Sequence, residues 1–147
     1  MELVDDRYED FQSRRPPLLG WVSDDFFNCG LVLGPPMDVA PLALDAARGA
    51  MWAPGADGAE QCVGEGSGAD IIDGHPLNSL VWLANSEVAR ALGGLPRGWI
   101  VSLCSVTRTA WLASPDARVR VEFRRSAEPD ADVLSSLEVS FVHCSST

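Results

Sequence analysis

The segment GHPLNSLVWLANSEVARALGG, from Gly74 to Gly94, restricts the fold of this chain more than any other stretch. Asp73 can cap a first helical turn, Pro76 suits the first helical position, and the Gly93–Gly94 pair allows a left-handed stop. The segment therefore predicts one principal helix over about residues 76–92. It is a scaffold element whose apolar residues share one face: Leu77, Leu80, Val81, Ala84, Val88, Ala91 and Leu92.

Most of the remaining regular structure is expected to be β-strand. Apolar or alternating runs predict strands in MELVDDRY, FFNCGLVLG, Trp99–Ser105, Val119–Phe123 and Leu137–His143. Turn signals at Pro54–Gly55 and Asp57–Gly58 predict a hairpin of two or three strands. The glycine-spaced stretch GEGSG, together with FQSRRPPLLGW and SAEPDAD, is interpreted as loop or connection. These features predict a single α+β domain, mostly β, over residues 1–147.

The charge balance narrows the choice of partners. The net charge of −10 disfavours nucleic acid and anionic membrane surfaces. The chain has no lysine, which excludes a lysine Schiff base or general base. No apolar run approaches the ~18 residues of a membrane span. The acidic start lacks the order of a secretory signal, so we expect a cytoplasmic protein.

The cysteines stand far apart and form no Cys-x-x-Cys pair, which disfavours a zinc site. We expect free thiols in a reducing compartment. The adjacent His143 and Cys144 fall at the tail of a predicted strand, where neighbours point to opposite faces. They are therefore not expected to form a catalytic dyad.

Four segments, in chain order, carry a resemblance to a known family: ELVDDRYEDF, SDDFFNCGLVLG, GEGSGADIIDGHPLNSLVWLANSEVARALGG and GWIVSLCS. They resemble the 2-keto-4-pentenoate hydratase / 2-oxo-3-hexenedioate decarboxylase branch of the fumarylacetoacetate hydrolase family. The likeness runs from Glu2 to about Phe141 and corresponds to the C-terminal half of a usual family member. The helix segment with its HPLN…WLAN core is the most specific part.

The resemblance implies a fumarylacetoacetase C-terminal-like mixed β-roll with a metal-dependent pocket. There a divalent ion, Mg²⁺ or Mn²⁺, holds the carboxylate and ketone of a small 2-oxo acid and stabilises an enolate. Glu2 stands at the position of the family's third metal carboxylate; structurally, it would be a solvated residue at a chain end. The other two carboxylates, a Glu-x-Glu pair, and the family's proton-shuttling lysine belong to the half that this sequence does not contain.

Three acidic residues are the catalytic candidates that the resemblance implies. Asp5 and Arg7 match the acidic and basic residues that follow the metal carboxylate, and Arg7 would bind substrate. Asp24 matches the aspartate of a short acidic-amide segment, and Asp25 replaces its usual asparagine. The structural alternatives are an Asp5–Arg7 ion pair on one strand face and a helical turn that starts at the two aspartates.

The remaining substrate-binding candidates adjoin the predicted helix. Ser105 matches the serine of a Thr-Gly-Ser turn that contacts the substrate carboxylate, and Leu103 and Cys104 replace the threonine and glycine. The replacements stiffen the turn, remove a hydroxyl donor and make it more apolar. His75 either contacts ligand or donates a hydrogen bond that structures the helix start.

Three functions are compatible with these residues. The first is a lyase-type enzyme, a hydratase or decarboxylase, that acts on a small 2-oxo acid, either alone or with a partner chain that supplies the missing ligands. The second is a repurposed, metal-independent isomerase, dehydratase or cyclase of a biosynthetic pathway. The third is a non-catalytic interaction subunit. Exposed sheet edges predict oligomers in each case, as a homodimer or with a paralogue of the family.

Overall fold

The computed structural model describes residues 1–5, 17–40, 42–103, 105–112, 114 and 116–142. The chain divides into two compact units, Met1–Leu33 and Gly34–Thr147. Helices and antiparallel strands are both present, so the α+β class predicted from the sequence is confirmed. Among the described residues, no helix has the length and apolar character needed to cross a membrane.

The first unit is built on two short strands. Strand β1 (Glu2–Val4) pairs antiparallel with β2 (Asn28–Leu31), as the apolar runs predicted. Between them lies α1 (Leu18–Ser23), which was interpreted from the sequence as a connection because of the two prolines before it. Pro17 is instead the residue that precedes the first turn, where a fixed φ and a missing N–H cost nothing, and its carbonyl accepts hydrogen bonds from Gly20 and Trp21.

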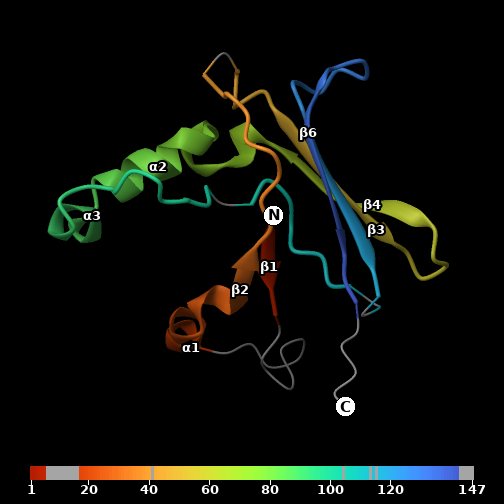
Figure 1. The fold of residues 1–147 in the computed structure, drawn as a ribbon, viewed down its shortest axis with the longest axis horizontal. Helices are drawn as coiled ribbons and strands as arrows, with labels where there is room; N and C mark the ends of the chain where they lie inside the picture. The colour runs from red at the N-terminus through yellow and green to blue at the C-terminus, as the bar shows by residue number, and fades with distance from the viewer. Residues whose placement is uncertain (6–16, 41, 104, 113, 115, 143–147) are drawn as a thin grey trace. The chain divides into compact units, whose positions relative to one another are not determined.

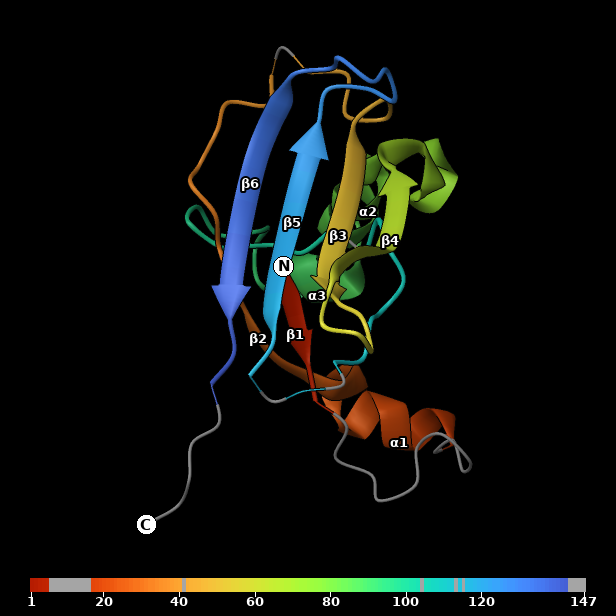
Figure 2. The same cartoon turned by 90° about the vertical axis from the view of Figure 1, so that its right-hand side faces the viewer.

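The second unit contains a four-stranded antiparallel sheet, with strand order β4-β3-β5-β6 (Figure 2). Its strands are β3 (Arg48–Pro54), β4 (Glu60–Ser67), β5 (Arg118–Arg124) and β6 (Val133–Ser140). The predicted hairpin joins β3 to β4, and Gly58 takes the left-handed φ of 78° that its turn requires. The connection SAEPDAD lies between β5 and β6, as predicted.

The two faces of this sheet differ because side chains alternate along each strand. One face is apolar and includes the buried Ala53 of β3 and Val119 of β5, which are each 3% exposed. The other face, here called the polar face, carries charged side chains and one tryptophan: Arg48, Trp52, Glu60, Arg120, Glu122 and Arg124. The polar face holds the hollow described below.

Two predictions about the glycine-rich part of the chain are wrong. Gly64 and Gly66 belong to strand β4 rather than to a loop, and the described part of Trp99–Ser105 forms no strand. A Cβ atom at Gly66 would collide with the main-chain carbonyl of Val106, so glycine in β4 lets the irregular segment at Val106 lie directly against the apolar face.

The predicted principal helix is divided in two. Helix α2 (Pro76–Ala84) ends at Asn85, and α3 (Glu87–Ala91) starts anew at Ser86, whose Oγ accepts a hydrogen bond from the Ala89 N–H at 3.1 Å. The two helices follow one another and lead away from the sheet (Figure 1). A serine at an N-cap competes for main-chain donors and therefore interrupts an otherwise continuous helical pattern.

The two ends of this helical segment are stabilised by specific residues. His75, and not Asp73, is the N-cap of α2, because Asp73 lies in a preceding 3₁₀ turn, η3 (Ile72–Gly74), with φ 54°. At the other end the prediction is confirmed: Gly93 N–H donates to the Arg90 carbonyl at 3.1 Å, and Gly94 N–H donates to Ala89 at 2.8 Å. These two bonds form a Schellman motif.

Candidate functional site

An open hollow of about 270 Å³ lies on the polar face of the sheet, above strands β3, β4 and β5. The connection that follows β5 contributes to its wall. We call it the sheet hollow. It is lined by charged and aromatic side chains, chiefly Arg48, Trp52, Glu65, Glu122, Arg124 and Glu128. Ligand sites are commonly concave surfaces of this kind with a few convergent polar groups.

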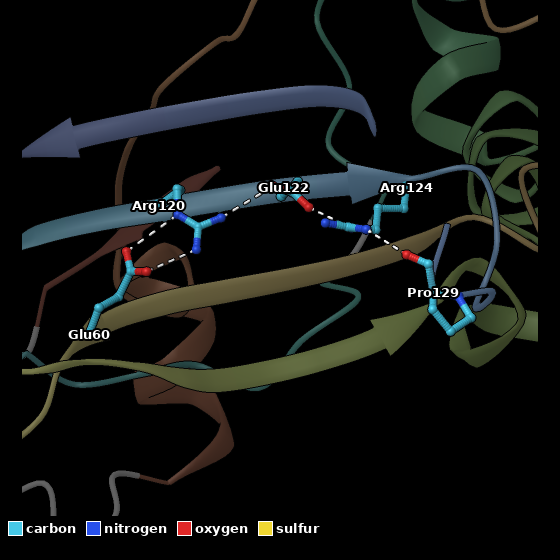
Figure 3. A network of polar contacts seen from close by, with 5 residues as sticks. All are labelled: Glu60, Arg120, Glu122, Arg124 and Pro129. Atoms are coloured by element: carbon cyan, nitrogen blue, oxygen red, sulfur yellow. Dashed lines mark hydrogen bonds and ion pairs between the residues drawn. The ribbon is translucent and has the colours of Figure 1, made fainter. Parts of the chain in front are cut away.

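A chain of charged contacts runs along β5 beside the sheet hollow (Figure 3). Arg120 donates to both carboxylate oxygens of Glu60, from Nε at 3.3 Å and from Nη2 at 2.9 Å. Its Nη1 donates to Glu122 at 3.2 Å, and its guanidinium lies 4.0 Å from the centroid of the Trp52 ring. Arg120 is therefore held on three sides, which positions the tryptophan wall.

Glu122 is the centre of this network. Its side chain is only 11% exposed, and its second oxygen accepts from Arg124 Nε at 2.6 Å. Arg124 Nη1 in turn donates to the Pro129 carbonyl at 3.3 Å, which ties the β5–β6 connection to the sheet (Figure 3). Both carboxylate oxygens of Glu122 are thus engaged by arginine, so this residue neutralises the cations beside it.

The ion pair between Glu60 and Arg120 shifts the pKa values of both groups, each in the direction that favours its charged form. The hydrogen bond from Arg120 lowers the pKa of Glu60, and the same contact raises the pKa of Arg120. A separate contact lies at the end of β4. There the Ser67 main-chain N–H and hydroxyl lower the pKa of Asp70, and Arg48 adds a smaller effect of the same sign. These carboxylates therefore stay ionised at neutral pH.

Arg48 differs from the other arginines of the polar face. It is paired across the sheet with Arg124, so two cations face each other directly. Its side chain forms no hydrogen bond or ion pair with any described residue, and the same holds for the exposed Glu65. In the sheet hollow, the guanidinium of Arg48 and the carboxylate of Glu65 are therefore not hydrogen-bonded to the protein. The guanidinium can bind the acid group of a ligand, and the carboxylate can accept a proton.

The four acidic residues predicted from the resemblance all lie in the first unit. Glu2 is exposed on β1, and the Asp5 N–H donates to the Phe27 carbonyl at 3.0 Å. Asp24 ends α1, and Asp25 opens η1 (Asp25–Phe27), a 3₁₀ turn in which Asp25 itself has a left-handed φ of 50°. The predicted turn at these aspartates is therefore present. Arg7 lies outside the described residues.

The other predicted site residues lie in the second unit. His75 Nδ1 accepts a hydrogen bond from the Leu77 N–H at 3.1 Å, so it structures the helix start as an acceptor and not, as predicted, as a donor. Leu103 is half-buried and Ser105 is exposed, while Cys104 lies outside the described residues. None of these described residues lines the sheet hollow.

The described candidate residues fall into two sets, the acidic residues in the first unit and the substrate-binding candidates in the second. Within the described part of the chain, no three histidine, cysteine, aspartate or glutamate side chains gather as a metal ion would require. Glu2 thus belongs to no such group of three among the described residues. The metal role of Glu2 stays a prediction.

The residues that line the sheet hollow were not predicted from the sequence. One signal was present: in RVRVEFRR, residues 118–125, charges alternate with apolar residues and so project from one face of a strand. The position of Arg48 opposite Arg124 depends on the pairing of β3 with β5, for which the sequence has no local signal.

Comparison with known protein families, curated proteins and solved structures finds no match for this chain. The function proposed below is therefore supported by the chemistry of the sheet hollow and by the four segments quoted above. The residues that line the sheet hollow all belong to the second unit.

Proposed function

We propose that this chain is a lyase-type enzyme, a hydratase or decarboxylase, that acts on a small 2-oxo acid through an enolate. The observation that carries the proposal is the composition of the sheet hollow, whose lining includes Arg48, Arg124 and Glu65. A 2-oxo acid needs a cation for its carboxylate and a base for the proton next to its ketone.

The chemistry follows from these two groups. In a hydration, Glu65 would take a proton from carbon 3 of 2-oxo-4-pentenoate, and the C–H electron pair would form the dienolate. The protonated Glu65 would return this proton at carbon 5, which leaves a C3=C4 double bond conjugated with the ketone. Hydroxide from water would then add to carbon 4, and the enolate so formed would take the remaining proton of that water at carbon 3. In a decarboxylation of 2-oxo-3-hexenedioate, no proton is taken from carbon 3: the C5–C6 bond breaks, CO₂ leaves, its bonding electrons form the dienolate, and carbon takes up a proton. The chain has no lysine to serve as the base, and the proposal assigns that role to Glu65.

Turnover by the purified chain tests the proposal. The substrates are 2-oxo-4-pentenoate, whose hydration removes its ultraviolet absorbance, and 2-oxo-3-hexenedioate, whose decarboxylation releases CO₂. We expect activity toward at least one, and a loss of kcat of about 100-fold or more for Glu65→Gln. Glu87→Gln is the control, because Glu87 lies on α3 outside the sheet hollow. The absence of turnover by the wild type, or equal kcat values for both variants, would refute the proposal.

Trp52 favours the metal-independent isomerase, dehydratase or cyclase as a second candidate. Its ring forms one wall of the sheet hollow and is held by Arg120 at 4.0 Å. An aromatic wall suits a larger, more apolar acid than a 2-oxo acid of a few carbons. Binding of cinnamate can be compared with binding of pyruvate by calorimetry. A markedly higher affinity for cinnamate would support this second function, and the reverse order would remove it.

We extend the proposal to location and assembly. The thiols of Cys29 and Cys62 are free and exposed, which is typical of a reducing compartment such as the cytoplasm. We also propose a homodimer, or a complex with a paralogue of the resembling family. Light scattering on the purified chain, alone and with such a paralogue, tests the assembly: a single monomeric mass in both samples would contradict it.

A further inference from the structure

Two arginines face each other across neighbouring strands at the sheet hollow. Arg48 of β3 is in register with Arg124 of β5, and both line the hollow. Like charges directly opposite in an antiparallel pair repel each other, because their Cβ atoms are only about 5 Å apart. Such a pair is stabilised by an anion bound between the two guanidinium groups.

The protein itself neutralises only one of these two cations. Arg124 is engaged by Glu122 at 2.6 Å and by the Pro129 carbonyl at 3.3 Å. Glu122 accepts from Arg124 through one oxygen and from Arg120 through the other at 3.2 Å, and neither oxygen is hydrogen-bonded to Arg48. The protein's own carboxylates on β5 thus leave the charge of Arg48 unpaired.

The carboxylate of Asp70, after β4, is hydrogen-bonded to a residue other than Arg48. Asp70 and Arg48 attract each other electrostatically, but Asp70 Oδ2 accepts from the Ser67 main-chain N–H at 2.6 Å and from the Ser67 hydroxyl at 3.1 Å. The side chain of Arg48 forms no hydrogen bond or ion pair with any described residue. Its planar array of N–H donors is available for a bidentate contact with a carboxylate.

We propose that Arg48 binds the carboxylate of a small monocarboxylic acid in the sheet hollow, with Arg124 as a second cation that Glu122 holds in place. The inference deepens the proposed function, on which the identity of the acid rests, by naming its anchoring residue. The rest of the wall determines the class of acid. Glu65 and Glu128 place two further negative charges in the hollow, so a second carboxylate on the ligand is repelled.

This charge arrangement separates the two reactions of the proposed function. The hydratase substrate 2-oxo-4-pentenoate carries one carboxylate, whereas the decarboxylase substrate 2-oxo-3-hexenedioate carries two. Of these two, the sheet hollow suits the monocarboxylate. We therefore infer a hydratase-type substrate.

The experiment measures binding without turnover. The full chain, freed of metal with EDTA and labelled with ¹⁵N, is titrated with pyruvate while the indole N–H signal of Trp52 is followed by NMR. We expect millimolar binding by the wild type and at least tenfold weaker binding by Arg48→Gln. Arg48→Lys should be intermediate, because it keeps the charge and loses the planar fork. Arg97→Gln is the matched control, since Arg97 is exposed and outside the sheet hollow, and it should bind like the wild type.

Two further readouts exclude a merely structural role of Arg48. Removal of one member of a like-charge pair should leave the Tm of Arg48→Gln unchanged or raised, so weaker binding cannot be ascribed to unfolding. Malonate, a dicarboxylate, should bind more weakly than pyruvate. Tighter binding of malonate would overturn the inferred specificity. Pyruvate affinities of Arg48→Gln and wild type within twofold, or the absence of saturable binding to the wild type, would overturn the anchoring role.

The same samples distinguish this inference from the proposed function. If the wild type binds pyruvate through Arg48 but turns over neither 2-oxo acid, the carboxylate site stands and the lyase proposal falls. If the wild type is active and Arg48→Gln has the same KM and kcat, the lyase proposal stands and the anchoring role falls.

Discussion

Arg124 donates through Nε to Oε1 of Glu122 at 2.6 Å, and both residues project from the polar face of the same strand. A second arginine, Arg120, occupies the other carboxylate oxygen at 3.2 Å. One carboxylate, 11% exposed, therefore joins two cations that would otherwise repel each other and the facing Arg48. We therefore expect the positions of the arginine side chains at the sheet hollow to depend on the negative charge of Glu122.

Glu122→Gln tests that dependence. The substitution keeps the size of the side chain but removes the charge from two hydrogen bonds to arginine, and we expect a loss of about 1.5–3 kcal/mol in the free energy of unfolding. Urea unfolding followed by circular dichroism measures it. The control is Glu138→Gln, whose pair with Arg118 is exposed on both sides and should contribute at most about 1 kcal/mol. Equal midpoints for the two variants would contradict the central role of Glu122.

The stability of the ion pair between Glu60 and Arg120 should depend on pH. The hydrogen bond from Arg120 lowers the pKa of Glu60 from its ordinary value of 4.5. A carboxylate whose folded pKa lies below its unfolded value stabilises the fold above the unfolded value, and this contribution disappears as the pH falls through the folded value. The difference in Tm between wild type and Glu60→Gln should therefore be largest near neutrality and vanish in acid.

Thermal unfolding over a series of pH values from about 7 to about 3 checks this expectation. Asp130→Asn, in the β5–β6 connection, provides the control, because no contact of the Asp130 side chain is present among the described residues. The exposed position of Glu60 keeps the expected effect small. A pH-independent difference between wild type and Glu60→Gln would show that the ion pair does not contribute in solution.

Gly66→Ala should destabilise the second unit. A Cβ atom at this position would overlap the main-chain carbonyl of Val106, which cannot move without displacing the whole segment from the sheet. We expect a loss of about 1–3 kcal/mol in urea unfolding, the usual cost of overpacking. Gly34→Ala is the matched control, since its Cβ would lie 3.6 Å from Ser135 Oγ, an ordinary contact. Unchanged stability of Gly66→Ala would exclude the close approach of the Val106 segment.

His75 can be assigned to structure or to ligand binding by two substitutions. Its Nδ1 caps α2 through the Leu77 N–H at 3.1 Å, so His75→Ala should lower stability by about 1 kcal/mol, whereas His75→Asn should keep the cap. Thermal unfolding and the pyruvate titration are measured on both variants. We expect the pyruvate affinity to stay within twofold of the wild type in each. Loss of affinity in both variants, at unchanged stability, would instead place His75 at the ligand.

The predicted metal role of Glu2 has its own measurement. Mg²⁺ and Mn²⁺ are titrated into the chain by calorimetry with and without oxalate, and the resemblance predicts that Glu2→Gln weakens binding about tenfold, or about 1.4 kcal/mol. Glu138→Gln, on β6, is the control with the same loss of charge. An isotherm that Glu2→Gln leaves unchanged would remove Glu2 as a ligand, and the absence of binding heat in both titrations would remove the metal site.

Local features of the fold were predictable because their causes lie within a few residues. The left-handed stop at Gly93–Gly94 needs only two glycines, and the hairpin turn at Gly58 needs only one residue that tolerates a positive φ. The alternating charges of residues 118–125 define a two-faced strand whatever lies beside it. In each case the interaction partners are sequence neighbours.

Only the tertiary structure decided the features that depend on partners far along the chain. No strand forms in the described part of Trp99–Ser105, and the close approach of Val106 to Gly66 of β4 joins residues 40 positions apart in the sequence. Arg48 and Arg124 lie opposite each other because of the register of β3 against β5. That register pairs residues about 75 positions apart in the sequence. Residue types and local periodicity specify how a strand alternates, but register is a property of two strands. The sheet hollow therefore exists only in the folded chain.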